Sequence, residues 1–383
     1  MMSRPFLLAM IVAVLAGCSL GSKDNSEPPA ELGDFDKRVE LRESWSYSTG
    51  SGTDGRLVRL QPAVVGDRVF VADRDGSVAA IDLENGKRIW RTKTGLHISA
   101  ATGVGGGLVL AGSSEGRLVA LDALTGEQRW LTDVPSEVLS VPQVYEGIVI
   151  VQTVDGSVSG LSADNAEPLW VYDRSVPVLT LRGTSTPLLV GGAVIAGFAN
   201  GKMVALEANT GREIWSAAVA VPRGRTELER IVDLDADPAI KDGVLYAGGY
   251  QGRLVAVSLR DGRTLWNRDM STYRKIAVDE SQVTVTDADS EVWAIDRRGG
   301  RSLWKQDALR WRNLTGPVVV GDYIGVGDFE GYLHLLSATD GAIVGRIRVD
   351  SEGIQATPVA VSDNRLLVLG AGGKLVLYRI KPR

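Results

Sequence analysis

The fold is decided by a pattern that three stretches share, GSVAAIDLENGKRIW at residues 76–90, GRLVALDALTGEQRW at 116–130 and GKMVALEANTGREIW at 201–215. Each stretch begins with glycine, continues through an apolar segment and a turn, and ends with tryptophan. Short apolar segments between glycine-containing turns are typical of β-hairpins. The repeat therefore predicts an all-β protein built from copies of one small unit.

The unit occurs eight times along the chain. Its first position falls at Gly76, Gly116, Gly156, Gly201, Gly252, Ser290, Gly331 and Gly373. Six copies carry tryptophan fourteen residues later, and Gly345 replaces it in the seventh. Because 300 residues separate Trp45 from Gly345 over seven steps, the period is about 43 residues. Four-stranded units at this period are propeller blades. We predict an eight-bladed β-propeller with four-stranded blades over residues 39–383.

The two ends of the repeat array complement each other. The eighth copy stops at Arg383 without a tryptophan strand, whereas Trp45 lies in a strand that has no blade before it. Pairing of these segments would close the ring and remove two open sheet edges. The tryptophans are expected to cover the flanks between blades. A small residue, four positions after the origin in six copies, is expected to permit close stacking of the sheets.

Proline recurs fourteen residues before the origin. It is found there in five copies, at Pro62, Pro142, Pro187, Pro238 and Pro317. Proline cannot donate to a strand ladder and belongs on an edge strand. We therefore expect these prolines within the innermost strand of each blade.

The N-terminus has the outline of a secretory signal. Arg4 precedes an apolar run from Pro5 to Val14, which is shorter than the roughly 20 residues that span a bilayer. The following Leu-Ala-Gly-Cys resembles the lipobox of bacterial lipoproteins, in which the cysteine receives a diacylglycerol. We predict a signal peptide at residues 1–17 and lipidation of Cys18, the single cysteine of the chain. The alternative is a chance cysteine after an ordinary signal peptide.

Residues 18–38 are expected to form a flexible tether behind the lipid. Most of this segment, SLGSKDNSEPPAELGDFD at 19–36, is polar and rich in proline and glycine. Ser19 follows the cysteine, in place of the aspartate that typically retains lipoproteins in the inner membrane. By that resemblance the destination is the periplasmic face of the outer membrane.

Composition and isolated polar residues exclude several functions. The net charge of −5 disfavours binding to nucleic acid. The only two histidines, His97 and His334, are too few for a metal centre or a catalytic triad. The segment DLDAD at 233–237 begins like a calcium loop, but Pro238 stands where glycine is required. A partner-facing acidic loop or a solvated turn remains.

Two neighbouring connections are unusually long. Trp170 to Pro187 spans 17 residues and Trp215 to Pro238 spans 23, against 10 to 14 for most others. Both cross from an outer strand to the next inner strand, so they should emerge side by side on one face. Long loops on a rigid scaffold commonly carry function. The first contains the apolar and cationic segment VLTLRG at 178–183, and the second contains Asp233 and Asp235.

The tryptophan-marked segments resemble the repeats of PQQ-dependent quinoprotein dehydrogenases, which are also eight-bladed. A periplasmic PQQ-dependent quinoprotein dehydrogenase is therefore the alternative function. Those enzymes are typically longer and bind PQQ with calcium, and many contain a disulfide between adjacent cysteines. With its one cysteine assigned to the lipid, this chain is expected to hold no cofactor and no metal and to catalyse no reaction.

A second resemblance covers essentially the whole chain. The lipobox, the tether, the eight blades and the segments LTLRG at 179–183 and ERIVDLDADP at 229–238 resemble the BamB family of outer-membrane protein assembly factors. The resemblance implies a non-catalytic scaffold in the barrel-assembly complex, anchored in the outer membrane by its acyl chains, that binds the POTRA region of BamA and assists insertion of β-barrel proteins. Unfolded β-barrel precursors are a further candidate partner. The implied BamA-binding residues are Leu179, Leu181, Arg182, Asp233 and Asp235. The alternative for the leucines is that they only pack the loop.

Overall fold

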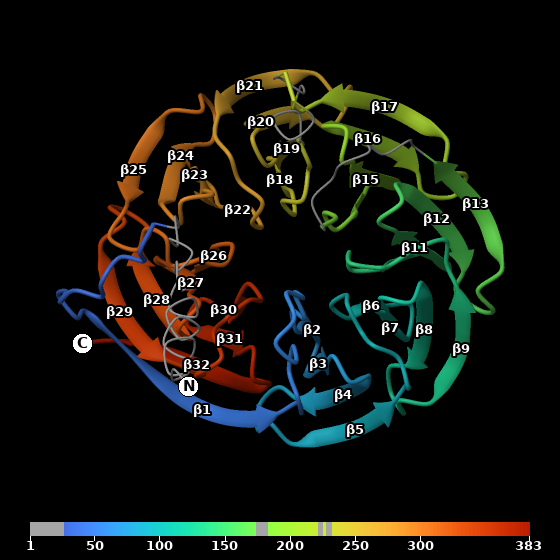
Figure 1. The fold of residues 1–383 in the computed structure, drawn as a ribbon, viewed down its shortest axis with the longest axis horizontal. Coiled ribbons are helices and arrows are strands. Elements are labelled where there is room, and N and C mark those ends of the chain that lie inside the picture. The colour runs from blue at the N-terminus through green and yellow to red at the C-terminus, as the bar shows by residue number, and fades with distance from the viewer. Residues whose placement is uncertain (1–26, 174–182, 221–224, 227–231) are drawn as a thin grey trace, which may run out of the picture.

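Each repeat forms one sheet of four antiparallel strands. The turns of the first repeat contain Gly66, Gly76 and Gly86, whose φ angles of 60°, 86° and 71° suit glycine. The structure is a computed structural model that describes residues 27–173, 183–220, 225–226 and 232–383. Its eight sheets stand radially around one axis (Figure 1), so the predicted eight-bladed all-β propeller is confirmed.

The blades follow one another in chain order. Blades 1 and 2 contain β2 (Ala63–Val65), β3 (Arg68–Ala72), β4 (Ser77–Asp82), β5 (Arg88–Lys93), β6 (Gly103–Gly105), β7 (Leu108–Gly112), β8 (Arg117–Asp122) and β9 (Gln128–Asp133). Blades 3 and 4 contain β10 (Gln143–Tyr145), β11 (Ile148–Gln152), β12 (Ser157–Ser162), β13 (Pro168–Asp173), β14 (Leu188–Val190), β15 (Ala193–Gly197), β16 (Lys202–Glu207) and β17 (Glu213–Ala218).

The second half of the ring repeats this order. Blades 5 and 6 contain β18 (Ala239–Lys241), β19 (Val244–Ala247), β20 (Arg253–Ser258), β21 (Thr264–Asp269), β22 (Ala277–Val278), β23 (Gln282–Thr286), β24 (Val292–Asp296) and β25 (Ser302–Gln306). Blades 7 and 8 contain β26 (Val318–Val320), β27 (Tyr323–Gly327), β28 (Tyr332–Ser337), β29 (Ile343–Arg348), β30 (Val359–Ser362), β31 (Arg365–Leu369), β32 (Lys374–Pro382) and β1 (Val39–Ser48).

The N-terminal strand closes the ring. β1 pairs with β32 in antiparallel register, from Val39 opposite Pro382 to Ser48 opposite Lys374. It is therefore the outer strand of blade 8, although it comes first in the chain (Figure 1). The two ends of the repeat array pair as the sequence predicts.

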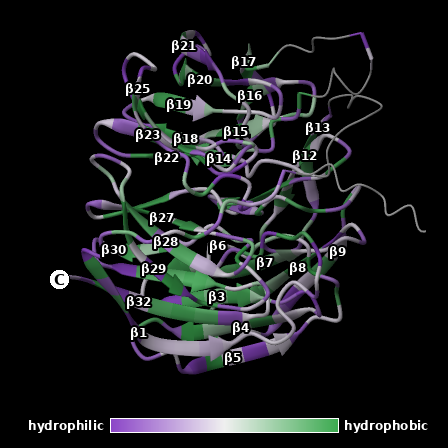
Figure 2. Cartoon of the chain, turned by 60° about the vertical axis from the view of Figure 1, so that its left-hand side comes forward, coloured by the Kyte–Doolittle hydropathy of each residue, from purple (hydrophilic) through white to green (hydrophobic). Residues whose placement is uncertain are grey.

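The two middle strands of each blade form the apolar interior of the ring. In blade 1, β3 and β4 are buried at nearly every position, whereas in β5 only Trp90 is buried. Figure 2 shows the same arrangement by hydropathy, with apolar strands inside and polar segments toward the surface. In the described part of the chain, no helix is long and apolar enough to cross a membrane.

Tryptophan joins each blade to the next at seven of the eight junctions. The indole N–H of Trp90 donates to the carbonyl of Ala123 in blade 2, at 3.1 Å. The ring also covers the turn of that blade, since a Cβ on Gly126 would stand 2.6 Å from it. The other indoles donate in the same way, at 2.8–3.0 Å, in the pairs Trp45–Leu83, Trp130–Ala163, Trp170–Ala208, Trp215–Leu259, Trp266–Arg297 and Trp304–Ala338.

The small residue of the repeat makes room for the tryptophan of its own blade. Ala80 pairs directly with Trp90, and Gly160 pairs with Trp170. A Cβ on Gly160 would stand only 2.3 Å from the Trp170 ring. The sequence interpretation, close stacking of neighbouring sheets, located these positions correctly but gave the wrong reason. The constraint acts within one blade.

Two details near strand ends differ from expectation. The five repeated prolines lie immediately before the innermost strands and not within them, for example Pro62 before β2. At a strand entrance the missing N–H removes no ladder hydrogen bond.

Residues 27–38, predicted to belong to a flexible tether, form no helix or strand but contact blade 7, where Leu32 packs against buried apolar side chains.

Loss of one docked tryptophan should destabilise the whole ring. Trp90→Ala removes a large buried ring and its hydrogen bond, and we expect the free energy of unfolding to fall by about 3–5 kcal/mol. Ile89→Ala is the matched control, because Ile89 is the preceding residue of the same strand and is 43% exposed. Chemical denaturation measures both. Equal losses in the two variants would contradict a special role for the indole.

Candidate loop-face binding site

The long connections emerge at one end of the ring because of strand direction. β3 and β5 both run antiparallel to β4, so the β3–β4 turn and the β5–β6 connection leave from the same end. We call this end the loop face; it carries the described parts of the outer-to-inner connections, from residues 49–62 to residues 349–358. Backbone hydrogen bonds link its segments around the ring, such as Ile98 N to Arg74 O at 3.2 Å.

The structure brings the described ends of the two long connections together. A Cβ on Gly183, at the end of the first, would stand 2.5 Å from Oδ2 of Asp235 in the second. Close by, the backbone N–H of Thr186 donates to Oδ1 of Asp237 at 2.6 Å. Leu179, Leu181 and Arg182 lie outside the described residues.

Asp233 and Asp235 are buried, with 1% and 6% of their surfaces exposed. A solvated turn, one of the two interpretations left open by the sequence, is therefore wrong. Asp233 also fixes the neighbouring blade 5 turn through its backbone, because its carbonyl accepts from the Tyr250 N–H at 3.0 Å. The acidic pair lies at the base of the loops, where it can set their conformation.

Burial, together with the nearby Asp233 carboxylate, raises the pKa of Asp235 to about 7, while Arg59 opposes the shift. Arg59 comes from the connection between blades 8 and 1, across the ring from Asp235. Its guanidinium donates to the carbonyl of Tyr273 at 3.0 Å and to that of Asp235 at 3.4 Å. One arginine thus ties together loops from opposite sides of the loop face.

A cavity of about 480 Å³ opens among these loops. Arg59 and Arg274 supply positive charge to its wall, Asp235 supplies a carboxyl group, and the apolar lining includes Leu139 and Ile354. Burial lowers the pKa of Arg274 to about 10, so it remains protonated at neutral pH. Its guanidinium lies 4.5 Å from the centre of the Tyr273 ring and donates to Asn313. Guanidinium groups beside apolar walls suit carboxylates and peptide carbonyls.

Sequence reasoning did not identify Arg59 or Arg274. Arg274 lies in an outer-to-inner connection of ordinary length, whereas Arg59 lies in the connection from Trp45 to Pro62, which spans 17 residues, as many as the first long connection. Neither residue belongs to a motif. The sequence signal for both residues is that they lie in outer-to-inner connections, since strand direction places all such connections on one face. Their convergence follows from closure of the ring, which brings segments more than 200 residues apart to one cavity.

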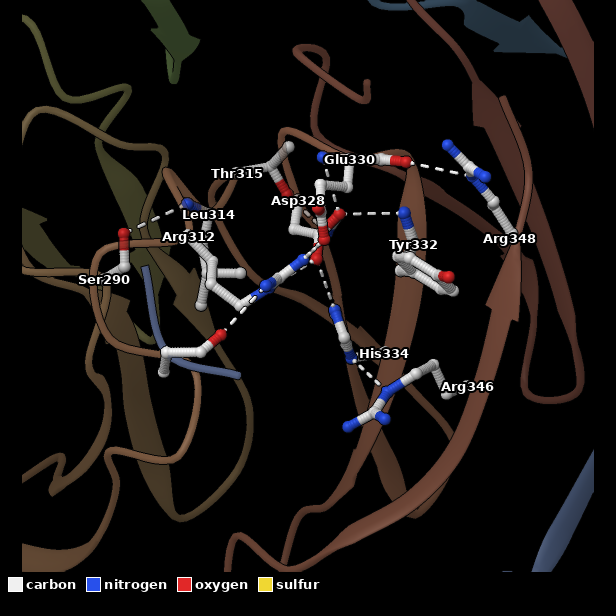
Figure 3. A network of polar contacts seen from close by, with 12 residues as sticks. Ser290, Arg312, Leu314, Thr315, Asp328, Glu330, Tyr332, His334, Arg346 and Arg348 are labelled. Carbon is white, nitrogen blue, oxygen red and sulfur yellow. Dashed lines mark hydrogen bonds and ion pairs between the residues drawn. The ribbon is translucent and has the colours of Figure 1, made fainter. Parts of the chain in front are cut away.

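Both histidines make local polar contacts. His97 is exposed, with Nδ1 2.5 Å from a carboxylate oxygen of Glu115. His334 is fully buried in blade 7, where Nε2 lies 3.0 Å from Asp328 and Nδ1 accepts from Arg346 (Figure 3). Burial lowers the pKa of His334. Among the described residues, no group of three or more His, Cys, Asp or Glu side chains is placed to hold a metal ion.

Comparison with known proteins identifies the family. The sequence model described as outer membrane protein assembly factor BamB matches residues 34–97 and 74–306. Outer membrane protein assembly factor BamB of Pseudomonas aeruginosa is 50% identical over 375 residues, 98% of each chain. The chain belongs to the BamB family. The BamB protein of Yersinia pestis is 36% identical, with 94% of this chain and 95% of that protein covered.

Solved structures of one family member and of an enzyme both resemble the chain. BamB from Moraxella catarrhalis superimposes with a TM-score of 0.82 at 29% identity, covering 89% of this chain and all of that one. Quinohemoprotein alcohol dehydrogenase from Comamonas testosteroni gives a TM-score of 0.72 at 15% identity, covering 90% of this chain and 76% of the enzyme. The second likeness shows the fold alone.

The raised pKa of Asp235 predicts a pH-dependent stability. Its ordinary pKa of 3.8 applies to the unfolded chain, and about 7 to the folded one. Between these values the folded chain binds more protons, so stability falls as pH rises through the window. Between pH 5 and pH 7 the free energy of unfolding of the wild type should fall by about 2 kcal/mol more than that of the Asp235→Asn variant.

Urea unfolding at both pH values measures this difference. Asp133→Asn is the control, since the side chain of Asp133 is 92% exposed. If Asp235→Asn and the wild type lose the same stability between pH 5 and pH 7, the buried carboxyl group is not protonated as described.

Proposed function

We propose that this protein is a non-catalytic scaffold lipoprotein of the outer-membrane β-barrel assembly machinery, and that its loop face binds the POTRA region of BamA. The observation that carries the proposal is the convergence of the two long connections at Gly183 and Asp235. Membership of the BamB family supports the role in assembly. The regular blades supply a rigid support for this face.

The buried carboxyl groups favour a division of labour within the site. Asp233 and Asp235 have almost no exposed surface with which to contact a partner. We assign to them the orientation of the loops, and we assign partner contact to Leu179, Leu181 and Arg182. Leucines provide apolar area, and a guanidinium can pair with a carboxylate or with backbone oxygens. Removing either carboxyl group would then weaken binding indirectly.

The anchor completes the proposal. Acyl chains on Cys18 would hold the protein at the periplasmic face of the outer membrane, which fits relatives that are named outer membrane protein assembly factors. We do not propose the alternative function, a PQQ-dependent dehydrogenase, because the likeness to such enzymes stands at 15% identity or less. The cavity residues described above suit recognition of peptide groups.

Charge reversal at Arg182 should weaken BamA binding without unfolding the protein. We expect Arg182→Glu to lower affinity for the BamA POTRA region about tenfold or more, as loss of an interface arginine commonly does. Pull-down and titration with purified POTRA domains measure the effect.

The matched control is Arg260→Glu in the β20–β21 turn, which is exposed at the opposite end of the ring. It should bind like the wild type. If both variants fold and bind BamA equally well, the loop face is not the interface.

A further inference from the structure

The junction between blades 7 and 8 lacks the tryptophan found at the other seven. Gly345 occupies the tryptophan position and pairs with Leu335, where most blades carry alanine or glycine. A Cβ on Gly345 would stand 2.7 Å from Cγ2 of Val39, the first residue of β1. The space left by the absent indole is therefore taken by the N-terminal part of the chain.

Residues 27–38 continue this contact along the outside of blade 7. The N–H of Ala30 donates to the carbonyl of Arg310 at 3.0 Å, and Nη1 of Arg312 donates to the carbonyl of Ala30 at 2.9 Å. Leu32 packs against a buried apolar cluster that includes Leu309 and Leu314. Backbone and side chain thus both hold this end of the segment.

A second set of contacts holds its other half. Nη1 of Arg346 donates to the carbonyl of Gly33 at 3.1 Å, and the same guanidinium lies 4.9 Å from the centre of the Phe35 ring. At the end of the segment, the N–H of Arg38 donates to the carbonyl of Val344 in β29, at 3.0 Å.

Arg312 and Arg346 are also held by contacts within blade 7 that do not involve residues 27–38. Arg312 is only 3% exposed, and its Nε donates to Oδ2 of the fully buried Asp328 at 2.8 Å. His334 bridges Asp328 to Arg346, as Figure 3 shows, with the N-terminal ribbon in blue passing beside Arg312. Burying such a cluster is costly unless its charges are paired and hydrogen-bonded. These arginines supply donors to Ala30 and Gly33 from a prearranged network.

The direction of the segment follows from these contacts. Ala30 lies beside the β25–β26 connection, on the loop face, whereas Arg38 lies near the start of β29, at the opposite end of blade 7. The chain therefore leaves the propeller at the loop face. Only residues 19–26 separate Cys18 from Glu27. Fully extended, that stretch reaches about 30 Å.

We propose that residues 27–38 form a docked strap that, together with Val39, replaces the missing tryptophan at the blade 7–8 junction and directs the lipid-bearing N-terminus out of the loop face, so that this face is held toward the bilayer. The docking stands on the contacts alone. The orientation rests on the proposed lipidation of Cys18. The membrane surface would then lie on the same side of the molecule as the proposed BamA-binding loops.

Amide hydrogen exchange tests the docking without any membrane. The amides of Ala30 and Arg38 should exchange much more slowly than in an unstructured peptide, and the double variant Leu32→Asp/Phe35→Ala should lose that protection while β-strand amides keep theirs. Exchange of both amides at the unstructured rate in the wild type would overturn the strap, whatever the state of Cys18.

Energy transfer to acceptor-labelled lipids tests the orientation. Because Cys18 would be acylated, one introduced cysteine can be labelled in the full lipidated protein on vesicles of outer-membrane phospholipids. Ala308→Cys and Arg298→Cys are both exposed and both in blade 6, but at the loop face and the opposite end respectively. Transfer should be at least twofold larger from position 308, and undocking by the double variant should reduce the difference.

Equal transfer from the two positions, or larger transfer from position 298, would overturn the orientation. A protein that carries no acyl group and fails to associate with vesicles would instead contradict the proposed anchoring at Cys18. The exchange measurement would still decide the docking in that case.

Discussion

The indole that the outer strands of seven blades place on the turn of the next blade is the interaction on which the rest of the structure depends. Each indole makes two contacts with the next blade. Its ring packs closely on the turn, which carries glycine at six of the seven junctions and Ala166 at the other, and its N–H donates to a backbone carbonyl of that blade. A blade that makes both contacts is held at a defined spacing from its neighbour. This junction recurs around the ring, and β1 completes the last blade, so that all eight sheets have four strands.

This junction explains why the number of blades and the closure could be predicted from sequence. Tryptophan, the turn glycine and the small residue opposite the indole are each encoded within a single repeat, so their spacing is visible without any tertiary information. The departures arise where distant segments meet. The burial of Asp233 and Asp235, the reach of Arg59 across the ring and the docking of Ala30 on Arg312 depend on partners from other blades. Such contacts between distant segments cannot be predicted from the spacing of residues along the chain.

The same distinction separates scaffold from function. Enzymes with a similar ring exist, yet the fold alone does not carry their chemistry. Two irregular features distinguish this chain from a plain ring of repeats. The two long connections meet over buried carboxyl groups, and Val39 with the N-terminal strap compensates for the missing tryptophan of the seventh blade. The long connections emerge on the loop face, and the strap reaches the same face at Ala30. Membrane attachment and partner binding would thus be arranged on one side of a rigid ring.

Site-specific photocrosslinking in intact cells tests the claim of a single functional face most directly. Ala199 lies in the β15–β16 turn of blade 4, on the loop face between the two long connections, and Asn209 is exposed at the opposite end of the same blade. A photoreactive residue at position 199 should form an adduct with BamA, and one at position 209 should form none. Adducts of equal yield from both positions, or from position 209 alone, would contradict the account.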